Sequence, residues 1–135
     1  MNRIKPLIAI VEDEEPIRKA LRRLLRSAGM DVKSFPSGVE FLESLTNQWP
    51  DCVVLDLQMP VMDGFEVQER LAELRVSVPV VIITGHDSDE RRRLALAGFP
   101  VAYLRKPVKD QLLLDAIALA LRRSPQQSGA RNGDS

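Results

Sequence analysis

Cysteine and aromatic residues are scarce in this 135-residue sequence, and both shortages limit what the protein can do. The single cysteine, Cys52, cannot form a disulfide within the chain, which fits a reducing compartment. Aromatic residues make up 4% of the chain, too few for a surface on which single-stranded nucleic acid stacks. No apolar run approaches a membrane span, and residues 1–6 do not lead into a secretory signal. We therefore expect a cytoplasmic protein that does not bind membranes.

The chain also lacks an excess of charge of either sign. Nineteen basic and nineteen acidic residues cancel, so there is no general attraction to nucleic acid or anionic membranes. The composition, 44% hydrophobic and 28% charged, is typical of globular proteins, and the length suits one domain. We assign this domain to residues 1–123. Residues 124–135 are polar and rich in glycine, serine and glutamine, which predicts a disordered tail or the start of a linker.

Five apolar segments that alternate with helical patterns predict an α/β fold. Residues 52–55 are apolar without alternation, as in a strand that is buried on both faces. Residues 31–35 are more polar, which indicates an edge strand. Because strands and helices alternate, we predict a parallel sheet with helices on both faces. The predicted strands are residues 7–11, 31–35, 52–55, 78–83 and 101–104.

Start and stop signals mark five helices between and after these strands. The third helix carries Val67, Leu71 and Leu74 at helical spacing, and the fifth covers residues 109–123. For the other three helices, the signals are Pro16 and Gly29 for the first, Ser37 and Glu40 as a capping box for the second, and Asp87 or Ser88 with Gly98 for the fourth.

Polar side chains follow the predicted strands at the points where the strands end. Glu12 and Asp13 follow the first, Asp56 the third, Thr84 the fourth and Lys106 the fifth. Right-handed crossovers place all these ends along one edge of the sheet. Three carboxylates crowded there require a hard cation and a fixed positive charge, and Mg²⁺ suits such an oxygen-only set. Lys106 can reach a carboxylate or phosphoryl oxygen, and the hydroxyl of Thr84 can donate to another.

The sequence lacks the patterns of common hydrolases. It has no Ser-His-Asp arrangement, no metal-binding histidine cluster and no glycine-rich phosphate loop. Gln58 stands two residues after Asp56, where a phosphatase of the haloacid dehalogenase type would have a second acid. A carboxylate nucleophile beside a divalent cation and a lysine remains, and this chemistry forms an aspartyl phosphate.

Residues 7–123 resemble the receiver domain of two-component response regulators. No single matching group is specific, but all of them in this order, each at a strand end, are very specific. The triplet Thr84-Gly85-His86 resembles FixJ-like regulators in particular. The matching groups are Glu12-Asp13, Asp56 with Met59-Pro60 and Asp63-Gly64, Thr84-Gly85, and Lys106-Pro107.

The resemblance implies a role for each polar residue at the sheet edge. Asp56 would accept a phosphoryl group, whose oxygens Thr84 and Lys106 would contact. The donor would be a sensor histidine kinase or a phosphotransfer protein, and Mg²⁺ would be the cofactor. The Lys106–Pro107 peptide bond would be cis. The implied metal ligands are Asp13, Asp56, the backbone carbonyl of Gln58 and, directly or through water, Glu12.

The resemblance also implies a strand order of 2-1-3-4-5 in a doubly wound, flavodoxin-like sheet, and a conformational switch. Phosphorylation would draw Thr84 inward, and Tyr103 would follow. The surface of the fourth helix, fifth strand and fifth helix would change, and would regulate a partner or output or form a homodimer. Gln58 and His86 are candidates for tuning the hydrolysis of the phosphoryl group. The chain departs from the family pattern in one place, because the segment from Gly98 to Lys106 is one residue longer.

Such a domain promotes only its own phosphorylation and dephosphorylation, so we do not expect an enzyme or direct nucleic-acid binding. Two other classes stay open: a phosphate-independent interaction module of the same fold, and a flavodoxin-like enzyme or cofactor binder. Residues 12–15 could be a solvated helix start, Thr84 a helix cap, and Tyr103 a static side chain. Two apolar sets fit either core packing or an interface, namely Leu114, Ala118 and Leu121, and Ile17 with Ala20.

Overall fold

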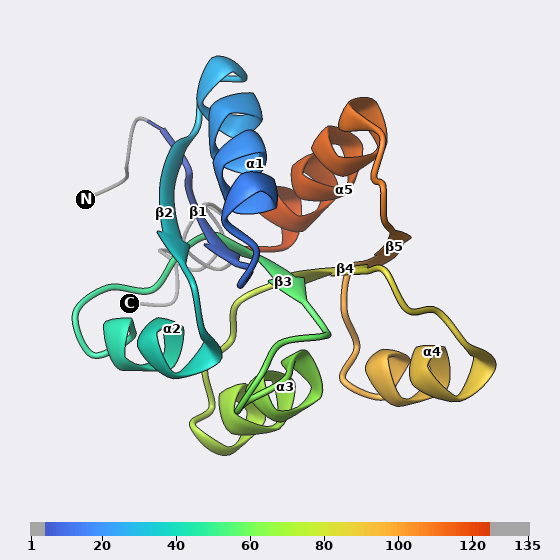
Figure 1. The fold of residues 1–135 in the computed structure, drawn as a ribbon. Coiled ribbons are helices and arrows are strands. Elements are labelled where there is room, and N and C mark those ends of the chain that lie inside the picture. Colours follow the sequence, from blue (N-terminus) through green and yellow to red (C-terminus); the bar gives the residue numbers. More distant parts are fainter. Residues whose placement is uncertain (1–4, 125–135) are drawn as a thin grey trace.

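Parallel hydrogen-bonded ladders join five strands into one sheet, in the order β2-β1-β3-β4-β5 (Figure 1). The structure, a computed structural model, describes residues 5–124. The predicted strand order and the parallel sheet are therefore confirmed. The strands are β1 (Leu7–Val11), β2 (Asp31–Phe35), β3 (Cys52–Asp56), β4 (Val80–Thr84) and β5 (Ala102–Arg105).

Helices cover both faces of the sheet and bury a separate core on each (Figure 1). On one face, Leu25 and Ile117 pack with side chains of the central strands. On the other, Phe41, Val67 and Ala95 are buried against the sheet. The first face is covered by α1 (Glu15–Ser27) and α5 (Asp110–Arg123), and the second by α2 (Gly38–Ser44), α3 (Gly64–Glu73) and α4 (Asp89–Leu96).

This double cover explains the hydropathy of the strands. Every residue of β1, β3 and β4 is buried, so an unbroken apolar run suits each of these inner strands. The more polar strand β2 lies at one edge of the sheet, as predicted, and all of its residues except Val32 are at least partly exposed. The central strands therefore hold the residues that follow them in fixed positions.

Two predicted strand starts are wrong by one or two residues, and β3, β4 and β5 each end one residue later than predicted. Strand β4 begins at Val80 rather than at residue 78, because Pro79 has no N–H and contributes only its carbonyl, which accepts from the N–H of Val53. Strand β5 begins at Ala102, one residue later than predicted. The longer segment before it is an exposed turn, in which Phe99 has a positive φ of 55° and is 90% exposed.

Side-chain caps fix the starts of three helices. Ser37 caps α2 by accepting from the N–H of Glu40, but the Glu40 carboxylate accepts from the Ser37 hydroxyl, so the predicted reciprocal box is not the arrangement seen. The reciprocal capping box forms at α3, between Asp63 and Glu66. Of the two candidates for α4, Ser88 is the cap.

The ends of the described region bear on two further expectations. Ser124, the first residue of the predicted tail, is buried and closes α5, whereas residues 125–135 lie outside the described residues, so their disorder stays a prediction. No helix within residues 5–124 has the length and apolar character needed to cross a membrane.

Candidate functional site

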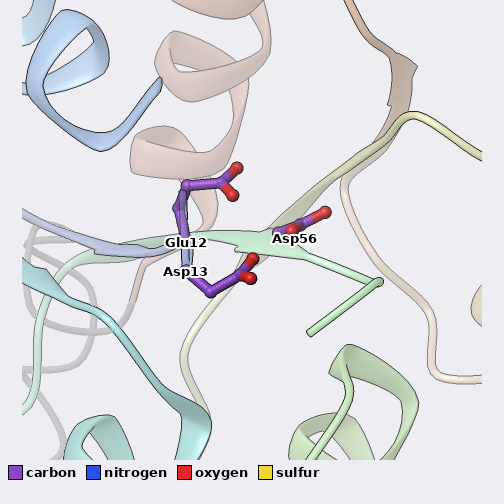
Figure 2. A group of neighbouring side chains, drawn as sticks. All are labelled: Glu12, Asp13 and Asp56. Atoms are coloured by element: carbon purple, nitrogen blue, oxygen red, sulfur yellow. The ribbon is translucent and has the colours of Figure 1, made fainter. Parts of the chain in front are cut away.

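Three carboxylates meet at the edge formed by the carboxyl ends of the strands. Glu12 and Asp13 directly follow β1, and Asp56 is the last residue of the neighbouring strand β3. One oxygen from each of the three side chains lies within 4.8 Å of the others, and Figure 2 shows the three side chains grouped at this edge. Glu12 and Asp56 are almost fully buried, at 0% and 1% exposed. The sequence-predicted acidic cluster is therefore assembled.

Lys106 supplies the positive charge at this cluster. Its Nζ lies 2.8 Å from Oε1 of Glu12 and 3.3 Å from Oδ1 of Asp56. The backbone N–H of Lys106 donates to the carbonyl of Thr84 at 2.7 Å, which fixes the residue beside the end of β4. Glu14, which the sequence did not single out, is a third and more distant partner, at 3.9 Å from Nζ. One ammonium group thus faces three acidic side chains.

Burial and charge make Asp56 difficult to ionise in this setting. Burial raises the pKa of the Asp56 carboxyl to about 7, and the negative charge of Glu12 adds to this effect. Lys106 and the N–H of Gln58, which donates to Oδ1 at 3.3 Å, lower the pKa but do not offset the increase. For Lys106, burial lowers the pKa, but the neighbouring Glu12 and Asp56 raise it more, so its ammonium stays charged.

The cluster suits a hard divalent cation. Within residues 5–124, Oδ1 of Asp13 is buried and has no hydrogen-bond partner, and such an oxygen is costly unless it meets a positive charge. The atoms available as metal ligands are carboxylate oxygens, which Mg²⁺ prefers. Arg18 of α1, which no sequence motif marks, donates to the carbonyls of Glu12 at 2.8 Å and Asp13 at 3.3 Å. Arg18 therefore holds the backbone of the acidic pair.

Thr84 ends β4 beside the cluster and is fully buried. Its Oγ1 accepts from the N–H of His86 at 3.1 Å and donates to the carbonyl of His86 at 3.3 Å. The helix-cap interpretation of Thr84 is wrong, because Ser88 caps α4. His86 itself is exposed, and its carbonyl also accepts from Nε of Arg91.

Tyr103 lies in β5, opposite Ile82 of β4, and is half-buried. Its hydroxyl donates to Oδ1 of Asp87 at 2.9 Å. The extra residue before β5 does not displace Tyr103 from the ladder, because the exposed turn at Phe99 accommodates it. The sequence indicates Tyr103 but not its partner, because Asp87 has the position of a candidate helix cap.

The backbone of Gly64 packs closely against the backbone of Asp56 and Leu57. A Cβ added at Gly64 would lie 2.6 Å from the carbonyl oxygen of Asp56 and 2.7 Å from Cα of Leu57, so only glycine fits there. Between these residues, Gln58 is exposed. The Lys106–Pro107 peptide bond is cis, as the resemblance implied.

The fold and the cluster together define a class of protein. In doubly wound sheets, ligands bind at the carboxyl ends of strands where the strand order reverses. The acidic cluster lies between β1 and β3, where this reversal occurs. The molecule is therefore a flavodoxin-like domain whose ligand site is acidic and contains a lysine.

The sequence matches the response regulator receiver domain family over residues 8–118, and the chain belongs to this family. It is 36% identical to nodulation protein W of Bradyrhizobium diazoefficiens, over 94% of this chain and 56% of that protein. It is 37% identical to the response regulator protein TmoT of Ectopseudomonas mendocina, over 94% of this chain and 58% of that protein. The chain thus spans about half the length of these curated relatives.

Solved structures give the same family. The response regulator StyR aligns with a TM-score of 0.87 and 37% identity, over 96% of this chain and 66% of that chain. FixJ-N aligns with a TM-score of 0.82 and 32% identity, over 89% of this chain and 96% of that chain. The chain is a receiver domain of two-component systems, a family that interacts with histidine kinases and typically binds Mg²⁺ through acidic residues.

Proposed function

We propose that this receiver accepts a phosphoryl group on Asp56 from a sensor histidine kinase or a phosphotransfer protein, with Mg²⁺, and thereby regulates a partner or output. The observation that carries the proposal is the meeting of Asp56 with two further carboxylates and with Lys106, whose Nζ is 3.3 Å away. The domain promotes only the formation and loss of its own aspartyl phosphate, and acts on no external metabolite.

Phosphoryl transfer requires Asp56 to act as an ionised nucleophile. One of its oxygens attacks phosphorus, an O–P bond forms, and the P–N bond to the donor imidazole breaks as the imidazole leaves. Lys106 favours the ionised carboxylate and then pairs with a phosphoryl oxygen. Thr84 gives up its bond to His86 and donates to another phosphoryl oxygen. Bound Mg²⁺ supplies further charge neutralisation, and would be held by Glu12, Asp13, Asp56 and the carbonyl of Gln58.

The residues around the transfer site support two further assignments. Gln58 and His86 are both exposed beside the site, so they are placed to influence the access of water and to tune hydrolysis. Thr84 and Tyr103 are the switch residues. Thr84 adjoins the cluster, and Tyr103 binds Asp87 in the segment that follows Thr84. Changing either Gln58 or His86 should alter the lifetime of the aspartyl phosphate more than its rate of formation.

An apolar groove beside Lys106 is the docking site that we propose for the phosphoryl donor. The groove has a volume of about 480 Å³, lies between α1 and the segment that joins β5 to α5, and includes Ile17, Ala20 and Pro107 in its lining. An amphipathic helix of the donor could place its apolar face there and its phosphohistidine at the cluster. This placement favours the interface interpretation of Ile17 and Ala20 over core packing.

The output surface that we propose comprises α4, β5 and α5, and phosphorylation would promote homodimerisation through it. Leu112 on α5 is 54% exposed, and Leu114 and Leu121 of the predicted apolar stripe are only partly buried. Ala118, the third member of the stripe, is exposed. Sedimentation with and without a phosphoryl mimic tests this proposal, and equal sedimentation would count against dimerisation.

Calorimetric titration with MgCl₂, followed by incubation with acetyl phosphate, tests the proposed chemistry. We expect wild type to bind Mg²⁺ and Asp13→Asn to bind it at least about tenfold more weakly. Asp63→Asn is the matched control, because it removes a nearby carboxylate charge that lies outside the cluster and keeps a good helix cap. Equal Mg²⁺ binding by all three proteins, or phosphorylation that persists in a chelator, would contradict the proposal.

A further inference from the structure

Asp87 binds the hydroxyl of Tyr103 and two arginines at once. Oδ1 accepts from the Tyr103 hydroxyl at 2.9 Å, and Oδ2 lies 2.7 Å from Nη2 of Arg92 and 3.7 Å from Nε of Arg105. The guanidinium carbon of Arg92 also lies 5.5 Å from the centroid of the Tyr103 ring. Two residues therefore hold Tyr103. Asp87, in the segment that joins β4 to α4, binds its hydroxyl, and Arg92 of α4 lies over one face of its ring.

The same segment holds the hydroxyl of Thr84. That hydroxyl has one proton, which it donates to the carbonyl of His86. Donation to a phosphoryl oxygen therefore requires this bond to break. His86 precedes Asp87 directly, and its carbonyl is also bound by Arg91. When the Thr84 hydroxyl leaves the carbonyl of His86, the backbone at His86 and at the adjoining Asp87 would thus be free to move.

We propose that Asp87 is a positioning residue that couples Thr84 to Tyr103. It holds Tyr103 against the β4–α4 segment while Thr84 is bonded to His86, and it releases Tyr103 when Thr84 turns to a phosphoryl group. The bond from Tyr103 to Asp87 thereby stabilises the arrangement in which Thr84 is turned to its own loop. This inference rests on the proposed function. It concerns how the bond between Tyr103 and Asp87 opposes phosphoryl binding, and how that binding then changes the position of Tyr103.

A static ion pair would have different consequences. It would add to the stability of the domain but would not change the affinity for a phosphoryl group, because it would be the same in both arrangements. A coupling residue, in contrast, must change that affinity when it is removed. Removal of either partner, Asp87 or the Tyr103 hydroxyl, should then have the same effect, and removal of both should add nothing.

The dissociation constant of the phosphoryl mimic beryllofluoride, measured with Mg²⁺, tests the coupling. The proteins are wild type, Asp87→Ala, Tyr103→Phe, the double variant and Asp89→Ala. Asp89 is the matched control, because it carries the same charge two residues away in the first turn of α4. We expect each single variant and the double variant to bind the mimic about five- to tenfold more tightly than wild type, and Asp89→Ala to stay within about twofold.

Absorbance titration of the Tyr103 hydroxyl shows independently whether its bond to Asp87 exists, since Tyr103 is the one tyrosine of the chain. Burial, the bond to Asp87 and the charge of Asp87 raise the pKa of Tyr103, so Asp87→Ala should lower it. Mimic affinity that is unchanged or weaker in the single variants, or effects that add in the double variant, would overturn the coupling while leaving the proposed function intact. Failure of wild type to bind the mimic would overturn both.

Discussion

Neutralising the proposed phosphoacceptor should stabilise the fold. Asp56 is buried beside Glu12, and its pKa is raised from 3.8 to about 7. Between these values the folded protein keeps a proton that the unfolded chain has released, so the free energy of unfolding falls as pH rises through this range. Above about pH 7 the full cost of the buried charge is present. Asp56→Asn removes this cost, so it should be more stable than wild type in the absence of divalent cations.

The expected gain follows from the size of the change in pKa. A carboxyl pKa of about 7 instead of 3.8 corresponds to about 4 kcal/mol of unfavourable ionisation. The substitution also removes the ion pair that Asp56 makes with Lys106 at 3.3 Å, which reduces the gain. We therefore expect Asp56→Asn to raise the free energy of unfolding by about 2–4 kcal/mol at about pH 8 and to have little effect near pH 4.

Urea denaturation in a chelator, at several pH values between about 4 and 8, measures this difference. Circular dichroism and the fluorescence of Trp49, the one tryptophan of the chain, both report unfolding. Asp115→Asn, at an exposed carboxylate on α5, should shift stability by less than about 0.5 kcal/mol throughout. Equal or lower stability of Asp56→Asn at about pH 8, or a gain that does not grow with pH, would refute the reasoning. Addition of Mg²⁺ should stabilise wild type more than the variant.

Three other substitutions or reagents test the surroundings of the site. Gly64→Ala should lower the free energy of unfolding by about 1–3 kcal/mol in urea denaturation, because its Cβ would meet the Asp56 carbonyl at 2.6 Å; wild-type stability would contradict the close contact. Val61→Gly should raise stability by about 0.5–1 kcal/mol, because this β-branched residue has a φ of 68° and is 96% exposed, and a loss would argue against strain there. Cys52, whose thiol is fully buried and has a strongly raised pKa, should react with a thiol reagent only after unfolding, and rapid native labelling would contradict its burial.

The order of the elements is predictable from the sequence because the inner strands carry their own signal. The run before Asp56 lacks alternation since helices cover both faces of β3, and such runs are typical of strands in parallel sheets. Once the strands are parallel, their carboxyl ends must share an edge, so the meeting of Glu12, Asp13 and Asp56 follows. Boundaries are less predictable, as Pro79 shows, because one missing N–H moves the start of β4 without changing its hydropathy.

The contacts that lie behind the cluster are not predictable in the same way. Arg18 donates to the carbonyls of Glu12 and Asp13, but its sequence position matches that of other arginines on the exposed face of α1. Asp87 resembles a helix cap in the sequence, and only the register of β5 against β4 brings the Tyr103 hydroxyl to it. Such contacts depend on side-chain direction and on exact turn length, and local spacing does not encode either.

The most direct test of the central claim is the intact mass of the protein after incubation with a small phosphodonor and Mg²⁺, beside Asp56→Asn. We predict that wild type gains one phosphoryl group, that the gain disappears in a chelator, and that the variant gains none. Equal addition to both proteins, or no addition to wild type under any condition, would contradict the assignment of Asp56 as the phosphoacceptor.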